Sequence, residues 1–226
     1  MSRFIRAFFW VTFALGANLS KSESAVIMLE TGVDDVFTVS STDILNGIAP
    51  TSTSGLSNFE EGMSYNNTGN NLTNGNFGAV GAGPNELTVV RANARLVYNI
   101  TSTDIYEIAT YSGWRDSGRS KQDYVVSVSS NGGNTWNLLY TVNSQSGSES
   151  QLVRILDDGG APLAMNINAI KFDFPTPQNG YVGYREIDVF GPAIPSAVPE
   201  PNTMAIGMIL SVCGFIGKRR MLRKPL

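Results

Sequence analysis

Apolar and polar residues alternate in short runs through the middle of the chain. Glycine, asparagine, aspartate or proline separates eight runs rich in β-branched and aromatic residues: NELTVVRA, ARLVYNI, DIYEIATY, DYVVSVSS, TWNLLYTV, QLVRILDD, INAIKFDF and VGYREIDVF. Such runs predict strands, because successive side chains of a strand point to opposite faces. No helical period interrupts them. We therefore expect an all-β fold, an antiparallel jelly roll or β-sandwich, over residues 25–195.

The N-terminal part of this domain is less regular. Strands are expected at Ala25–Leu29 and Val36–Val39, and long surface loops should follow through TSTSGLSNFEEGMSYNNTGNNLTNGNFG, which is rich in turn-forming residues. No second copy of a blade-like repeat is present, which excludes a propeller.

Both ends of the chain resemble targeting segments. Residues 1–24 begin with Arg3 and Arg6, continue with the apolar run Ala7–Ala17 and end in small polar residues. This order is typical of a secretory signal helix, with cleavage near Ser24 or Ala25. An amphipathic or buried helix is the alternative interpretation.

The C-terminal segment, residues 196–226, carries a proline motif, a short hydrophobic helix at 203–217 and a basic tail at 218–224. The motif is Val198, Pro199, Glu200 and Pro201, and the tail includes Lys218, Arg219 and Arg220. This order resembles the PEP-CTERM sorting signal, which implies an exosortase as partner. A plain membrane anchor is the alternative, although the apolar run is shorter than the roughly 20 residues that span a bilayer.

The resemblance implies an exported protein with a transient stage in the inner membrane. The precursor would be anchored by its tail, and the cleaved product would reside in the cell envelope, on the surface or in the extracellular matrix. Cys213, the single cysteine, lies within the tail, so the mature domain would contain no disulfide.

Composition excludes several functions. The chain has 226 residues with a net charge of −3, and it lacks the clustered basic residues that nucleic acid requires. It contains no histidine, which rules out Ser-His-Asp catalysis and histidine-ligated zinc. Six acidic residues occur as adjacent pairs in loop-like sequence, namely Asp34 and Asp35, Glu60 and Glu61, and Asp157 and Asp158, and adjacent side chains make a poor catalytic couple. We expect no enzymatic activity.

The stretch VSVSSNGGNTWNLL contains Ser129, Asn131, Gly133 and Trp136. It resembles the Asp-box hairpin of sialidases, with Asn131 in the aspartate position. Asn-Gly-Gly tolerates positive φ angles, so the stretch predicts a tight β-hairpin with Trp136 packed across the strand pair. A single Asp-box implies no catalytic chemistry.

The order of NNLTNGNFG, the central hairpin and the closing GYVGYREIDVFG resembles the galactose-binding-like family, which includes discoidin and coagulation-factor type C domains. The resemblance covers about residues 71–191 and implies a jelly roll that binds sugars with loops at one end. The matching loop is TYSGWRDSGRSKQD, which supplies Trp114, Arg115, Asp116, Arg119 and Gln122, and Tyr181 could line the same rim. Trp114 would stack on a sugar ring. Alternatively, Trp114 covers the core and the charges are solvated.

The same resemblance implies a calcium ion held by Asn74, Gly75 and Glu186. Calcium favours oxygen ligands, which loop carbonyls and one carboxylate can supply. The family usually has aspartate where this chain has Asn74, so affinity should be lower. Alternatively, Glu186 pairs with Arg185 or Arg154.

These patterns together predict a non-catalytic surface protein that binds or organises exopolysaccharide. A structural or adhesion protein that binds other proteins is the alternative. The exposure of Trp114 separates the two hypotheses, because sugar stacking requires an exposed indole.

Overall fold

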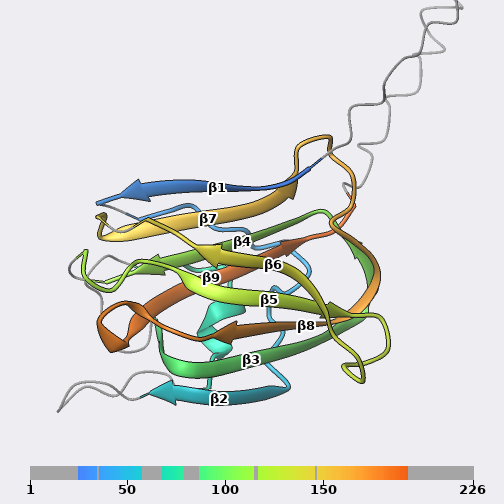
Figure 1. Ribbon diagram of the computed structural model, residues 1–226, viewed down its shortest axis with the longest axis horizontal. Helices are drawn as coiled ribbons and strands as arrows, with labels where there is room; N and C mark the ends of the chain where they lie inside the picture. Colours follow the sequence, from blue (N-terminus) through green and yellow to red (C-terminus); the bar gives the residue numbers. More distant parts are fainter. Residues whose placement is uncertain are drawn as a thin grey trace, which may run out of the picture.

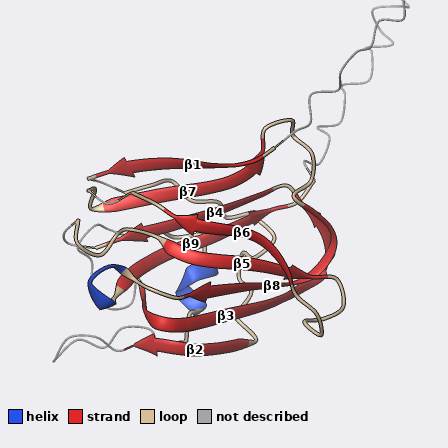
Figure 2. Cartoon of the chain, in the orientation of Figure 1, coloured by secondary structure: helices blue, strands red, loops and turns tan. Residues whose placement is uncertain are grey.

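The computed structural model describes residues 25–34, 36–57, 68–78, 87–114, 117–145 and 147–192. Nearly all regular structure in these residues is antiparallel β-sheet, which confirms the predicted fold class (Figure 1 and Figure 2). The strands are β1 (Val26–Val33), β2 (Ser52–Ser57), β3 (Thr88–Ile105), β4 (Glu107–Gly113), β5 (Asp123–Ser129), β6 (Asn137–Asn143), β7 (Ser150–Asp157), β8 (Ala164–Phe174) and β9 (Val182–Phe190).

Two short 3-10 helices, η1 (Asn70–Thr73) and η2 (Gln178–Gly180), complete the regular structure of the described part. No helix among the residues with a described placement is long and apolar enough to cross a membrane. The predicted signal helix at 1–24 and the predicted sorting tail at 196–226 lie outside the described residues.

The strands follow the order β1-β7-β4-β9-β3-β8-β5-β6, and β2 pairs with β3. Strand β3 belongs to two layers, because Thr88–Val90 pairs with β9 whereas Ala94–Ile105 pairs with β8. Asn93, with φ of 62°, lies between these two parts. Asparagine tolerates this left-handed conformation better than most residues, so the strand can turn from one layer into the other.

The main hydrophobic core lies between the two layers. Alternate residues of the strands point into it, including Tyr124, Val126, Ile155, Phe172, Phe174, Tyr184 and Ile187. The residues between them point outward, so each layer also has an outward face.

The outward face of β4 and β9 is covered by the segments 36–48 and 70–78. Phe37 lies 5.8 Å from Phe77 and 5.9 Å from Tyr111, measured between ring centroids. These rings form a second apolar cluster with Val39, Leu152 and Phe190. We call this surface the covered face, and the outward surface of β8, β5 and β6 the open face.

Three expectations about the strands are wrong. Val36–Val39 is not a strand, because its apolar side chains are used to cover β4 instead. Strand β2 arises within the predicted loop region, where TSTSGLS has little apolar alternation and is held by pairing with β3. The separate runs NELTVVRA and ARLVYNI contribute to one continuous strand, β3.

Candidate functional site

Two loops meet at the end of the jelly roll where β4 stops and β9 begins, and we call this the distal end. The loop after β4 spans residues 114–122, and the loop before β9 spans residues 175–181. Their contacts include the Lys121 N–H donating to Gln178 Oε1 at 3.0 Å and Asn179 Nδ2 donating to the Gly118 carbonyl at 2.9 Å. The loops therefore form a single hydrogen-bonded rim.

Trp114 lies beneath this rim and is only 5% exposed. It packs against Leu87 and Val89. A Cβ added at Gly183 would lie 2.6 Å from Trp114 Cε3, so the indole rests directly on the backbone of β9. The expectation that Trp114 is exposed is wrong, and the alternative that it covers the core is confirmed. The reason is the missing side chain at Gly183, which leaves room for the ring.

Two aromatic–cation contacts lie at the rim, and one of them includes an arginine that was not predicted as a site residue. The guanidinium carbon of Arg119 lies 5.0 Å from the centroid of the Trp114 ring. Tyr181 is partly exposed and has the guanidinium carbon of Arg91 at 5.1 Å from its ring centroid. Sequence reasoning missed Arg91, because it lies in a strand-forming run rather than in a polar loop. Arg115 and Asp116 lie outside the described residues.

Gln122, another candidate residue of the predicted loop, has a structural role. Its side chain is buried, and its Nε2 donates to the carbonyls of Thr110 at 2.9 Å and Gln151 at 3.0 Å. Buried amides are normally satisfied in this way. These two hydrogen bonds connect Gln122, immediately before β5, to β4 and β7, so the side chain stabilises the fold below the rim.

The predicted calcium ligands meet, but in a different arrangement. Glu186 is fully buried, and its Oε1 accepts the Gly75 N–H at 3.0 Å. The Asn74 N–H also donates to this carboxylate, while Asn74 Oδ1 accepts the Asn76 N–H at 2.9 Å. The loop presents N–H donors rather than carbonyl oxygens to Glu186, so this set does not fit a calcium ion as predicted. These N–H groups and the Glu186 carboxylate instead form a hydrogen-bonded clamp between the loop and β9.

The alternative salt-bridge partners of Glu186 make other contacts. Arg154 Nη2 donates to Glu107 Oε2 at 2.7 Å. Arg185 Nε donates to the Gly113 carbonyl at 3.2 Å. The expected pairing of Glu186 with Arg154 is therefore wrong.

Glu186 belongs to a group of three buried carboxyls with Asp188 and Asp43. Each has one oxygen without a hydrogen-bond partner among the described residues. Burial raises the pKa of Glu186 to about 8 and the pKa of Asp188 to about 6, and it also raises the pKa of Asp43. In the part of the chain that the structure describes, no three acidic, histidine or cysteine side chains are arranged to hold a metal ion.

A carboxyl with a raised pKa can mark an acid catalyst. Glu186 and Asp188 are both 0% exposed beneath the covering segments, however, so a substrate has no access to them. Their separation along the chain from Asp43 explains why sequence reasoning did not group the three residues.

The predicted hairpin between β5 and β6 is confirmed. Asn131 Oδ1 accepts the Thr135 N–H at 3.0 Å, and Gly132 and Gly133 have φ of 70° and 84°. Trp136, which follows the turn, is partly exposed and contacts β8, where Lys171 Nζ lies 5.0 Å from its ring centroid.

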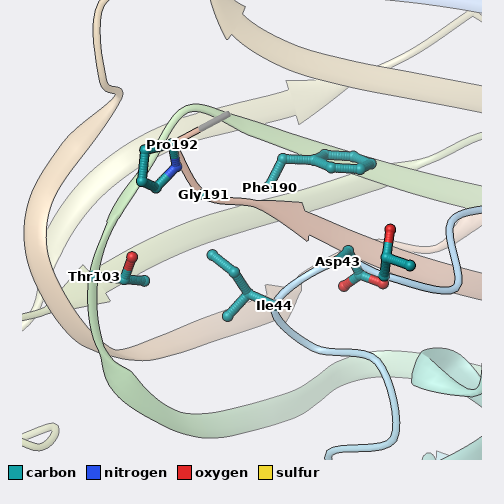
Figure 3. Close-up of a pocket in the computed structure, with 7 residues that line it drawn as sticks. Asp43, Ile44, Thr103, Phe190, Gly191 and Pro192 are labelled. Carbon is teal, nitrogen blue, oxygen red and sulfur yellow. The ribbon is translucent and has the colours of Figure 1, made fainter. Parts of the chain in front are cut away.

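A hollow of about 520 Å³ lies at the opposite end of the jelly roll. Figure 3 shows Asp43, Ile44, Thr103, Phe190 and Pro192 around it. Asp43 Oδ1 accepts the N–H groups of Leu45 and Val189, so this carboxyl fixes the covering segment to β9. None of the predicted sugar-binding residues lines this hollow.

Several solved structures resemble this chain at low sequence identity. A family 32 carbohydrate-binding module of Clostridium perfringens NanJ, solved with galactose, is 14% identical; the match covers 71% of this chain and 98% of that chain, with a TM-score of 0.45. The family 32 module of Streptococcus pneumoniae EndoD is 10% identical, with 66% and 99% covered and a TM-score of 0.49.

Allantoicase, an enzyme, is 15% identical, with 70% of this chain and 45% of that chain covered and a TM-score of 0.46. No protein-family model matches the chain, and no curated protein sequence does.

Proposed function

We propose that this chain is an exported, non-catalytic surface or matrix protein that binds or organises exopolysaccharide through the rim at its distal end. The observation that carries this proposal is the partly exposed ring of Tyr181 beside Arg91, next to Arg119 on Trp114. A pyranose offers an apolar face to an aromatic ring and hydroxyls to donors around it.

The hydrogen bonds between the two rim loops support the proposal. A rim that is already fixed before the ligand arrives loses less conformational entropy on binding. In this arrangement Trp114 lies buried beneath the rim and supports it, and the pyranose stacks on Tyr181 instead of Trp114. Arg91, which lies over the Tyr181 ring, and Arg119, which lies over the Trp114 ring, supply hydrogen-bond donors to the sugar. We propose Arg115 and Asp116 as further contacts in the loop after β4.

The test is a glycan array with the full chain, using Tyr181→Ala and the matched control Tyr106→Ala. Tyr106 is also partly buried but lies between β3 and β4, at the opposite end of the jelly roll. We expect Tyr181→Ala to weaken binding about tenfold, the effect of losing roughly 1.4 kcal/mol of stacking, whereas Tyr106→Ala has no effect. Equal binding by both variants would exclude the rim.

The burial of Trp114 favours a second candidate, a structural or adhesion protein that binds other proteins. This hypothesis expects no binding to any glycan on the array. It also expects the purified chain to associate with itself or with another surface protein, which light scattering after size-exclusion chromatography would detect.

Export and sorting by an exosortase are part of the proposal and rest on the sequence of the two ends. Intact-mass measurement of the protein recovered from the cell surface tests them. We expect a product that begins near Ser24 or Ala25 and lacks the tail. Replacing Pro199, Glu200 and Pro201 by alanine should leave the tail attached.

A further inference from the structure

The open face carries an aromatic residue that the distal rim does not use. Trp136 is partly exposed, and its ring lies over Lys171, whose side chain is only 16% exposed. The indole also touches the turn, because a Cβ added at Gly133 would lie 3.1 Å from Trp136 Cζ2. The indole therefore contacts both Lys171 and the turn, and part of its surface remains exposed.

A row of charged side chains continues from this ring across the open face. Lys171 Nζ lies 3.2 Å from Asp173 Oδ2, and Asp173 Oδ1 lies 2.5 Å from Arg95 Nε. Lys171 and Asp173 alternate with the core residues Ile170, Phe172 and Phe174 of β8, so they project from the outward face. The row therefore runs from Trp136, immediately before β6, to Arg95 on β3.

A shallow hollow of about 230 Å³ ends the row. Its lining includes Arg95, Asp173 and Val125, whose positions pair across β3, β8 and β5. The Cα atoms of Arg95 and Lys171 are roughly 8 Å apart diagonally, from the spacing of strands and the rise along them. The row and the hollow together make an extended strip rather than a point site.

We infer that this strip is a second polysaccharide-binding surface, in which the pyranose faces of a neutral glycan chain stack on Trp136 and its hydroxyls bind Asp173 and Arg95. The inference deepens the proposed function and rests on it. A domain with one glycan site on its rim and one on its face could link two polysaccharide chains. Because each protein would then join two polysaccharide chains, it would organise a polysaccharide matrix as well as bind to it.

The charges and the apolar area of the strip favour a neutral glycan over other occupants. Arg95 and Lys171 are both paired with Asp173, and Asp123 lies on the same face, where it accepts the Thr176 hydroxyl at 2.9 Å. Two positive and two negative groups leave no net charge to attract an acidic chain. Among the described residues of β5, β6 and β8, the exposed large hydrophobic residues are Leu138 (67%) and Met165 (64%), too little for a stable protein interface.

The test uses the full chain with its tryptophans labelled as 5-fluorotryptophan and assigned by single Trp→Phe replacements. Galactomannan and dextran serve as neutral probes, and alginate serves as the acidic probe. Fluorine NMR reports which indole responds to each polysaccharide. Native gels containing the same polysaccharides report affinity for the wild type, Trp136→Ala, Tyr181→Ala and the neighbouring control Thr141→Ala.

We expect a neutral polysaccharide to shift the Trp136 resonance, and we expect Trp136→Ala to weaken retardation about tenfold while Thr141→Ala has no effect. Trp136→Phe should retain most of the binding, because it keeps an aromatic face. If the wild type increased the light scattering of a polysaccharide solution but Tyr181→Ala and Trp136→Ala did not, this would support the linking of two polysaccharide chains by one protein.

Three results would overturn the inference. Neutral glycan binding with an unshifted Trp136 resonance and unchanged retardation of Trp136→Ala would remove the second surface but leave the proposed function in place. A Trp136 response to alginate alone would contradict the neutral ligand. The absence of binding to any probe would remove both the inference and the proposed function.

Discussion

The distal end and the open face of this jelly roll use similar residues for different purposes. Each has a tryptophan with a cation about 5.0 Å from its ring, Arg119 on Trp114 and Lys171 on Trp136. Trp114 is 5% exposed beneath the rim, whereas Trp136 remains partly exposed on the sheet. The surrounding chain, rather than the residue pair, decides whether an aromatic–cation contact supports the fold or is accessible to a ligand.

The carboxyls of the covered face and of the open face also differ in burial. Glu186 and Asp188 are buried beneath the covering segments, each with an oxygen that has no partner among the described residues. Asp173 on the open face is held between Arg95 and Lys171. Burial disfavours the ionised form of a carboxyl, and it raises the pKa of both Glu186 and Asp188.

The largest expected effect separates the two tryptophans. Trp114→Ala should lower the free energy of unfolding by about 3 to 5 kcal/mol, because it leaves a cavity on Gly183 and Val89. For a domain of this size, the melting temperature should fall by roughly 10 °C. Trp136→Ala should cost about 1 kcal/mol or less, since it loses mainly a cation–π contact. If calorimetry gave similar losses of unfolding free energy for Trp114→Ala and Trp136→Ala, the proposed difference between the two tryptophans would be wrong.

A smaller effect should appear in the dependence of stability on pH. The pKa of Glu186 is raised from 4.5 to about 8 and that of Asp188 from 3.8 to about 6, so between pH 4 and pH 8 the folded state binds more protons than the unfolded state. The free energy of unfolding should therefore fall as pH rises through this window. Glu186→Gln should flatten the fall, because it keeps an acceptor for Gly75 but cannot ionise.

Denaturant titrations at pH 5.5, 7 and 8.5 measure this slope, and Asp173→Asn is the control that should retain it. The same titrations with calcium chloride or EDTA test the clamp around Glu186. We expect the free energy of unfolding to be the same with calcium chloride as with EDTA. Calcium-dependent stabilisation that disappears in Glu186→Gln would instead show that a cation neutralises the buried carboxyls.

The smallest expected effect concerns the ion pair of the open face. The side chains of Arg95 and Asp173 are 52% and 28% exposed. Exposed pairs contribute little to stability, so Arg95→Gln should change the free energy of unfolding by about 0.5 kcal/mol or less. A loss above about 2 kcal/mol would show that the row supports the sheet and is not held in place for a ligand.

The sequence alone determined the local elements of this protein. Alternation predicted most strands, because a half-buried strand needs apolar residues on one face only. Asn131, Gly132 and Gly133 predicted the hairpin, because few other residues tolerate its backbone angles. Strand β2 could not be predicted in this way, since its Ser- and Thr-rich sequence is extended through pairing with β3 rather than by its own propensity.

Only the tertiary structure decided which residues are accessible. The loop sequence around Trp114 indicates exposure, but Gly183, far away in the sequence, provides the space that buries the ring. Val36–Val39 alternates like a strand, yet it covers β4 because the aromatic cluster there needs apolar contacts. Asp43, Glu186 and Asp188 become one buried group only after the covering segment packs on β9. Burial depends on contacts between distant segments, and local residue patterns do not contain that information.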